Sequence, residues 1–405
     1  MKGILTVACA FLKSTWQAVC RPFVDGLRRP SPLRSGSLRS ALTALLLASL
    51  AALHAAEPPP TDPWQPVTAA IEESQSQFPG GLTLEVMTPA GVVFSRNFGG
   101  FSDSKRAIIA SASKWVTATV LLRIVEHGDL SLDTQTKSLL VDRAGRPWSG
   151  NMGEIRLRHL LSFTAGISSD SKASEDKKIT LEEAILRIYD DQSPTASPPG
   201  SAFFYGGVTQ MRIAARMAER ATGLSWRELY DKYFRLPLGW SAESTYGGAA
   251  NPSNPSPGIG LVCTGREYTR FLMMQLRSGM DGSTRFLEAA SIATQHADAF
   301  GPSTTITHSA YGFLGKKYHY GLGNWLETEN GQEPTRDNPV NRWSSTGKFG
   351  WAPWIAADGK YAALIMTQQA DTPTAFVPSE NLKGKLDPLI RQALARNPQP
   401  IRVVP

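Results

Sequence analysis

The alternation of apolar and polar residues predicts a helix and then two strands at the start of the folded part. Residues 64–78 carry apolar side chains at helical spacing, and the sequence PGG at 79–81 ends this helix. Two strand-like runs follow, at 82–87 and 92–97, with a Gly- and Pro-containing turn between them. We therefore expect this segment to form a β-hairpin.

Helical periodicity takes over from Ser111. An apolar stripe at helical spacing begins there and ends before Gly128. Thr180 and Glu183 have the spacing of a capping box at the start of another helix. Helices are also expected at 156–163, 180–190, 210–222, 225–234 and 266–278.

Strand signals return near the end of the chain, at 354–357 and 362–368. Residues 382–395 predict a closing helix, which Pro388 either kinks or begins. A sheet assembled from both ends of the chain, with helices inserted between them, is the simplest arrangement of these elements.

The expected fold class is therefore α/β in the broad sense (α+β). It has a mixed, mainly antiparallel sheet flanked by helices and an inserted helical subdomain. The domain covers residues 64–405. Its sheet part comes from about 64–110 and 335–400, and its helical part from about 111–334.

Positive charge is concentrated at the start of the chain. The 405 residues carry a net charge of +7, and residues 1–56 hold seven cations against one acid. An apolar run at 41–53 and then small residues and prolines follow, as in a secretory signal. We expect 1–56 to be a signal peptide, 57–63 a Pro-rich linker, and the protein to be periplasmic or secreted in a bacterium. A retained anchor is the alternative, although the run is short for a membrane span.

The rest of the chain is nearly neutral, so we expect no nucleic-acid partner. No later segment has the pattern of a membrane span, so we expect no stable membrane insertion after cleavage. Cleavage would leave Cys263 as a single cysteine, expected to be buried and unable to form an internal disulfide. The histidines lack the spacings of a zinc site, and no dinucleotide or phosphate-binding glycine pattern occurs. We therefore expect neither a metal nor a cofactor.

Ser111 and Lys114 are the strongest local candidates for chemistry. Three residues apart on a helix, they share a face, and a buried lysine can lose its proton and serve as base for a serine hydroxyl. Only Ser111 opens a long apolar helix soon after a hairpin. The alternative is a helix-capping Ser111 beside a solvated Lys114. The spacing alone is weak evidence, because it recurs at Ser102, Ser169, Ser174 and Ser345.

Several further blocks follow in a recognisable order. ASASK at 110–114 is followed by LRIVEHGDLSLD at 122–133 and IRLRHLLSFTAG at 155–166. The later blocks are PGSAFFY at 199–205, ATG at 221–223, YGLG at 320–323 and GKFGWAPWI at 347–355. From about residue 67 to 370 the chain resembles the serine β-lactamase-like superfamily. This superfamily includes class C β-lactamases, D-alanyl-D-alanine carboxypeptidases, D-aminopeptidases and related carboxylesterases, and the resemblance implies their β-lactamase/transpeptidase-like fold.

The resemblance also implies roles for individual residues. Ser111 would be the nucleophile, Lys114 its base partner, and Tyr205 the tyrosine that shuttles a proton with Lys114. A phenol beside an ammonium favours its anionic form, which would suit Tyr205 as a general base. The backbone amides of Ser111 and Lys348 would bind the oxyanion.

Two motifs depart from the family pattern. The usual Tyr-x-Asn is YGG at 205–207, so Gly207 lacks the amide that contacts a lactam or peptide substrate. The usual Lys-Thr-Gly or His-x-Gly is STG at 345–347, so Ser345 replaces the cation that meets a substrate carboxylate, and Lys348 follows three positions on. The residues expected to bind substrate are Gly207, Ser345, Thr346 and Gly347.

The expected reaction is acyl transfer to water through an acyl-Ser111 ester, with small esters or amides as substrates. The altered motifs disfavour β-lactams. One alternative is a periplasmic D-amino-acid peptidase or a penicillin-binding or β-lactamase enzyme, which would take a peptide or lactam. Another is a non-catalytic binding paralogue, which the intact Ser111, Lys114 and Tyr205 disfavour.

Overall fold

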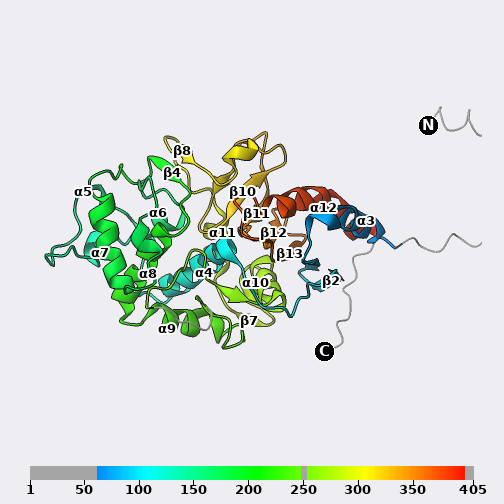
Figure 1. Ribbon diagram of the computed structural model, residues 1–405, viewed down its shortest axis with the longest axis horizontal. Coiled ribbons are helices and arrows are strands. Elements are labelled where there is room, and N and C mark those ends of the chain that lie inside the picture. Colours follow the sequence, from blue (N-terminus) through cyan, green and yellow to red (C-terminus); the bar gives the residue numbers. More distant parts are fainter. Residues whose placement is uncertain (1–61, 248–252, 397–405) are drawn as a thin grey trace, which may run out of the picture. The chain divides into compact units, whose positions relative to one another are not determined.

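A seven-stranded sheet with helices on both faces forms the centre of the protein (Figure 1). The computed structural model describes residues 62–247 and 253–396, so the predicted signal peptide and nearly all of the predicted linker lie outside the described residues. The strands, in order across the sheet, are β2 (Gly91–Phe98), β1 (Leu82–Thr88), β13 (Ala362–Met366), β12 (Ala352–Ala356), β11 (Val340–Ser344), β10 (Trp325–Thr328) and β9 (His319–Tyr320).

Strands from the two ends of the chain pair directly at the centre of this sheet. In the β1–β13 pair, Leu84 lies opposite Ile365, and every neighbouring pair in the sheet is antiparallel. This confirms the predicted fold class and the prediction that the sheet joins both ends of the chain.

Most of the helices lie in the chain between β2 and β9. They are α4 (Ser113–Glu126), α5 (Gly150–Gly153), α6 (Leu157–Leu161), α7 (Leu181–Gln192), α8 (Thr209–Thr222), α9 (Trp226–Tyr230), α10 (Gly265–Leu276) and α11 (Ala289–His296), with α3 (Gln65–Ser74) and α12 (Val377–Arg396) outside this part. Across residues 62–247 and 253–396, no helix is both long and apolar enough to cross a bilayer.

Both faces of the sheet are buried because each is covered by helices. Ala363 and Ile365 of β13 pack with α3 and α12, whereas Leu364 and Met366 belong to the larger core around α4 and α10. Alternate residues of a strand point to opposite faces, so a strand buried on both sides is apolar throughout. This explains why the sequence signal of β13 was a continuous apolar run.

Strands β9, β10 and β11 were not predicted, and the first two lie before residue 335, where the helical part was expected to end. Charged residues interrupt the apolar pattern by which β10 and β11 would have been predicted as strands. Glu327 of β10 and Arg342 of β11 are both buried, and their side chains pair at 3.0 Å. Lys383 of α12 meets the same Glu327 carboxylate at 2.5 Å. A buried charge needs such partners, and a pattern search based on apolar residues misses it.

The C-terminal helix begins earlier than predicted. It starts at Val377, with Pro378 in its first turn, where a missing N–H breaks no bond within the helix. Pro388 lies inside the helix and does not mark its start.

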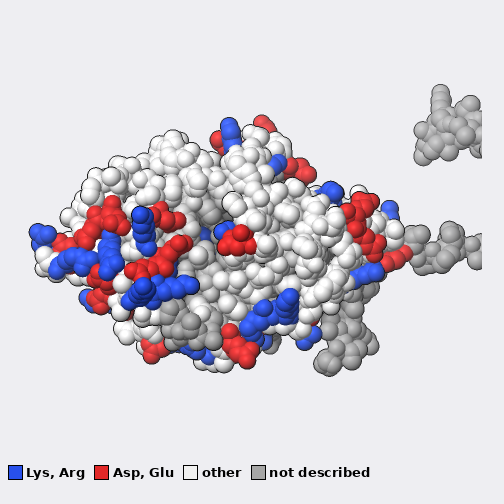
Figure 2. All heavy atoms as spheres, in the orientation of Figure 1, with Lys and Arg blue, Asp and Glu red and all other residues white. Residues whose placement is uncertain are grey.

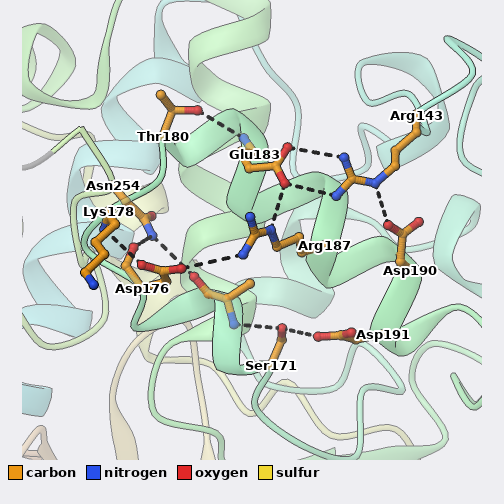
Figure 3. Close-up of polar contacts among 11 residues, drawn as sticks. Arg143, Ser171, Asp176, Lys178, Thr180, Glu183, Arg187, Asp190, Asp191 and Asn254 are labelled. Carbon is orange, nitrogen blue, oxygen red and sulfur yellow. Dashed lines mark hydrogen bonds and ion pairs between the residues drawn. The ribbon is translucent and has the colours of Figure 1, made fainter.

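Thr180 begins α7 as predicted, but only half of the capping box forms. Its hydroxyl accepts a hydrogen bond from the Glu183 amide at 3.1 Å, whereas the Glu183 carboxylate binds Arg143 and Arg187 (Figure 3). On the face drawn in Figure 2, basic and acidic side chains are interleaved over this end of the helical part.

Candidate active site

Ser111 lies between the short strand β3 (Ala107–Ile108) and helix α4. Ala110, directly before it, has a φ of 47°, in the left-handed region that is costly for a residue with a Cβ atom. Backbone strain of this kind persists only where the surrounding structure enforces it, and it is common at functional sites.

The structure brings Lys114 and Ser111 together, as their helical spacing predicts. The Lys114 Nζ donates to the Ser111 Oγ at 3.0 Å and to the carbonyl of Gly258 at 3.1 Å. The same Nζ lies 4.9 Å from the centre of the Tyr205 ring and 5.8 Å from that of Phe163.

Lys114 is fully buried, and its surroundings favour the neutral amine. Burial lowers the pKa of Lys114 to about 7, while the negative charge of Asp170 opposes this shift. At neutral pH a substantial fraction of Lys114 is therefore unprotonated and can accept a proton from Ser111.

Tyr205 follows strand β4 (Ala202–Phe204), which pairs in parallel with β8 (Thr305–His308). Burial raises the pKa of Tyr205 to about 12, although hydrogen bonding with Ser111 opposes the rise. The phenol is therefore protonated at neutral pH, and its expected anionic form is disfavoured by burial.

The predicted third motif lies behind Ser111. The Ser345 hydroxyl is buried and donates to the carbonyl of Ser111 at 3.2 Å and to that of Gly323 at 3.4 Å. At Gly347 a Cβ atom would lie 2.0 Å from the carbonyl oxygen of Ile109, so only glycine fits this close approach. Ser345 and Gly347 therefore pack against the backbone at Ser111 and at Ile109, two residues before it.

Thr346 and Lys348 border the cavity at the site. The Thr346 hydroxyl donates to the carboxylate of Glu380 in α12. The Lys348 ammonium lies 2.5 Å from Asp371, and its side chain is about half exposed. A cation paired in this way is a weak receptor for a substrate carboxylate.

A cavity of about 180 Å³ opens beside Ser111, and most of its wall is aromatic or apolar. Of the predicted substrate-binding residues, Thr346 lines it, whereas Ser345, Gly347 and Gly207 do not. Its lining consists of Ser111, Tyr205, Ala310, Tyr311, Trp325, Thr346, Lys348, Pro373 and Phe376. Larger hollows lie elsewhere, including one of about 610 Å³ around residues 304–319, so the Ser111–Lys114 contact, and not size, makes this cavity the candidate site.

The segment after Tyr205 is held by a carboxylate that the sequence analysis missed. Asp170 accepts hydrogen bonds from the backbone amides of Gly207, Val208 (3.3 Å) and Thr209 (3.0 Å). The sequence carried no signal for this contact, because Asp170 lies in a loop with no periodic pattern, far from Tyr205 along the chain.

The order of these motifs agrees with a comparison with known families. A family model described as Beta-lactamase matches residues 67–382. This protein belongs to the beta-lactamase family.

Two curated relatives and one solved structure show the range of this family. Monacolin J acid methylbutanoyltransferase of Aspergillus terreus is 27% identical over 155 residues, and esterase EstB of Burkholderia gladioli is 27% identical over 143 residues. Each match covers 32% of this chain and 36% of the relative, so the chain spans about a third of the length of each of these two relatives. A crystal structure from Bacteroides dorei, of a protein assigned as a beta-lactamase, is 27% identical. It has a TM-score of 0.67 and covers 81% of this chain and 99% of its own.

Members of the beta-lactamase family are serine hydrolases and acyl transferases, and the position of Ser111 and Lys114 at the start of an apolar helix fits that chemistry. Sequence analysis missed Tyr311, Trp325 and Phe376 in the cavity wall. Of these three, only Trp325 had a sequence signal, because it lies two residues after the YGLG block. Within the described residues, no group of three or more His, Cys, Asp or Glu side chains could hold a metal ion.

Proposed function

We propose that this protein is a serine hydrolase that acts through an acyl-Ser111 ester. The observation that carries the proposal is the 3.0 Å contact between the Ser111 Oγ and the buried Lys114 Nζ. A serine hydroxyl becomes a useful nucleophile when a neighbouring base takes its proton, and Lys114 is poised to be that base near neutral pH.

In the first half of the reaction, Ser111 attacks the carbonyl carbon of the substrate while its proton passes to Lys114. Tyr205, protonated at neutral pH, relays that proton to the leaving alcohol or amine. The backbone amides of Ser111 and Lys348 stabilise the oxyanion. In the second half, the same residues take a proton from a water molecule, which attacks the acyl-Ser111 ester. The bond between the acyl carbon and the Ser111 Oγ breaks, the proton returns to that oxygen, and the acid is released.

Small uncharged esters or amides are the substrates that this site favours. Its cavity wall is largely apolar, and the ammonium of Lys348 already pairs with Asp371. A β-lactam carries a carboxylate that would lack a free cation at this position. The relatives named as an esterase and an acyltransferase support this class, and an alcohol acceptor could replace water in the second half.

The test is a panel of p-nitrophenyl esters with nitrocefin alongside, run on the wild type and on Ser111→Ala. We expect ester hydrolysis to exceed nitrocefin hydrolysis, and Ser111→Ala to lose at least ~10³-fold in kcat. Ser102→Ala is the matched control, because Ser102 has the same spacing to a lysine, and its exposed hydroxyl shares a hydrogen bond with that of Ser104. Equal activity in wild type and Ser111→Ala would overturn the proposal.

An exported D-amino-acid peptidase or penicillin-binding enzyme is the second candidate, favoured by the leader-like residues 1–56. Labelling by a fluorescent penicillin that disappears in Ser111→Ala, with no ester turnover, would support it. A non-catalytic binding protein is the third candidate, and failure of Ser111 to react with a fluorophosphonate would support that one.

A further inference from the structure

The carboxylate of Asp170 binds the backbone directly after Tyr205. It accepts from three successive amides, those of Gly207, Val208 and Thr209, at the point where α8 begins. The residue that precedes α8, Val208, offers no side-chain cap of its own. Asp170 therefore supplies, from another loop, the acceptor that a helix start ordinarily receives from its own N-cap residue.

The two glycines after Tyr205 are shaped to this carboxylate. A Cβ atom on Gly206 would lie 2.8 Å from the Asp170 Oδ1, and one on Gly207 would lie 3.3 Å from its Oδ2. Neither glycine has a positive φ, so the backbone conformation does not require glycine at either position. At both positions an added Cβ atom would press against the Asp170 carboxylate, more closely at Gly206 than at Gly207.

The loop that carries Asp170 is anchored on two sides (Figure 3). The Ser171 hydroxyl donates to Asp191 of α7 at 2.5 Å, and its amide donates to the Thr209 hydroxyl at 3.0 Å. The Asn254 side chain donates to the carbonyl of Asp176 at 2.8 Å. Asn254 lies four residues before Gly258, whose carbonyl accepts a hydrogen bond from Lys114. The loop therefore contacts both the turn after Tyr205 and the segment that binds the Lys114 ammonium.

We propose that Asp170 is a positioning residue: it takes the space of the asparagine usual in this family, fixes the turn after Tyr205, and places a negative charge near Lys114. A carboxylate only accepts hydrogen bonds at neutral pH, so it holds backbone amides where an asparagine amide would also donate to substrate. Asp170 therefore fixes the turn without offering the donor that an asparagine amide would present to substrate.

The charge of Asp170 acts on three buried groups. It raises the pKa of Lys114 against the larger effect of burial, raises that of Tyr205 in the same direction as burial, and raises that of buried Arg212 on α8. Glu175, on the same loop, also acts on Arg212. For Lys114, Asp170 is the charge that counters burial.

The first test rests on the proposed function and uses Asp170→Asn, which keeps an acceptor oxygen and removes the charge. Without the charge the pKa of Lys114 falls, so the acid limb of kcat/KM should move to lower pH, by roughly half a unit. Asp176→Asn is the control, because Asp176 lies on the same loop and pairs with Arg187 at 3.5 Å. An acid limb that stays in place in Asp170→Asn would overturn the electrostatic role.

The second test is independent of turnover. Tm is measured for Gly207→Asn, Asp170→Ala and the double variant. Asn at position 207 should lower Tm in the wild-type background and lower it less, or raise it, when Asp170 is Ala, because the carboxylate no longer fills the space. Additive effects would overturn the claim that Asp170 and Gly207 compete for one space.

The outcomes separate the two proposals. Activity that survives Ser111→Ala overturns the proposed function, and the Tm cycle still tests the fit between Asp170 and the glycines. Activity that depends on Ser111, with neither a shifted acid limb in Asp170→Asn nor coupling to Gly207, overturns the inference about Asp170 alone.

Discussion

The hydroxyl of Ser345 donates to the carbonyl of Ser111 at 3.2 Å, behind the proposed nucleophile. Ser345 is the first residue of the STG motif, a position that ordinarily faces substrate in this family. Here its side chain joins the end of β11 to the turn that carries Ser111. The sequence analysis placed Ser345 among the substrate-binding residues, whereas the structure gives it two backbone carbonyls as partners.

Ser345→Ala should therefore lower kcat and leave KM nearly unchanged. The loss of one or two hydrogen bonds worth about 1 kcal/mol each loosens Ser111 and corresponds to a roughly tenfold fall in kcat. Steady-state kinetics on a p-nitrophenyl ester measures both constants. A raised KM with an unchanged kcat would instead mean that Ser345 contacts substrate.

The rate should depend on pH through Lys114. Because burial lowers the pKa of Lys114 to about 7, the neutral base is present above that pH and is lost below it. We expect kcat/KM to fall about tenfold per pH unit on the acid side of this limb. Single-turnover acylation of Ser111 over the same pH range checks that the limb belongs to the chemical step. A profile that is flat between about pH 5 and pH 8 would exclude Lys114 as the titrating base.

Gly347 and Lys348 should respond very differently to the same substitution. Gly347→Ala places a Cβ atom against the Ile109 carbonyl, and the displaced backbone should cost about 10²-fold in kcat/KM. Lys348→Ala keeps the backbone amide and removes a half-exposed ammonium that pairs with Asp371, so the change for a neutral ester should stay within about fivefold. A severe loss in Lys348→Ala would show that its side chain, and not its amide, takes part.

The buried ion pairs of Glu327 with Lys383 and Arg342, between the sheet and α12, should stabilise the folded protein. Lys383→Met leaves the fully buried Glu327 with one fewer partner, and should lower the free energy of unfolding by about 3–5 kcal/mol. Urea unfolding measures this, and Lys360→Met, which removes an exposed ion pair with Asp358, is the control. A loss no larger than in the control would mean that the Lys383–Glu327 pair adds nothing.

The same pair predicts a pH dependence of stability. Burial alone would raise the pKa of Glu327, but Lys383 and Arg342 lower it to about 2 from the usual 4.5. Its contribution is therefore present above pH 4.5 and is lost as the pH falls toward 2. Urea unfolding at several acidic pH values should show this loss in the wild type and a smaller one in Glu327→Gln.

The sequence was most informative where local rules and packing agree. Ser111 and Lys114 were found because a pair with the right spacing opened an apolar helix. Strand β13 was found because burial on both faces makes it apolar, and β1 because apolar residues alternate along it. The spacing of apolar and polar residues does not reveal contacts between polar residues that are distant in the sequence, even where function or stability depends on them. Asp170 touches the Tyr205 turn from another loop, and Glu327 and Arg342 look like surface residues until their partners are known.

The pairing of β1 with β13 also fixes the order in which the protein can assemble. Strand β1 is made early, but its neighbour at the centre of the sheet ends at Met366, so this pair cannot form until almost the whole chain is available. Contacts between such distant segments close slowly, because the entropy of a long loop is lost before they form. The contacts of Ser345 with Ser111 and of Gly347 with Ile109 also join distant segments, so the backbone around the nucleophile is completed late, after the local Ser111–Lys114 pair.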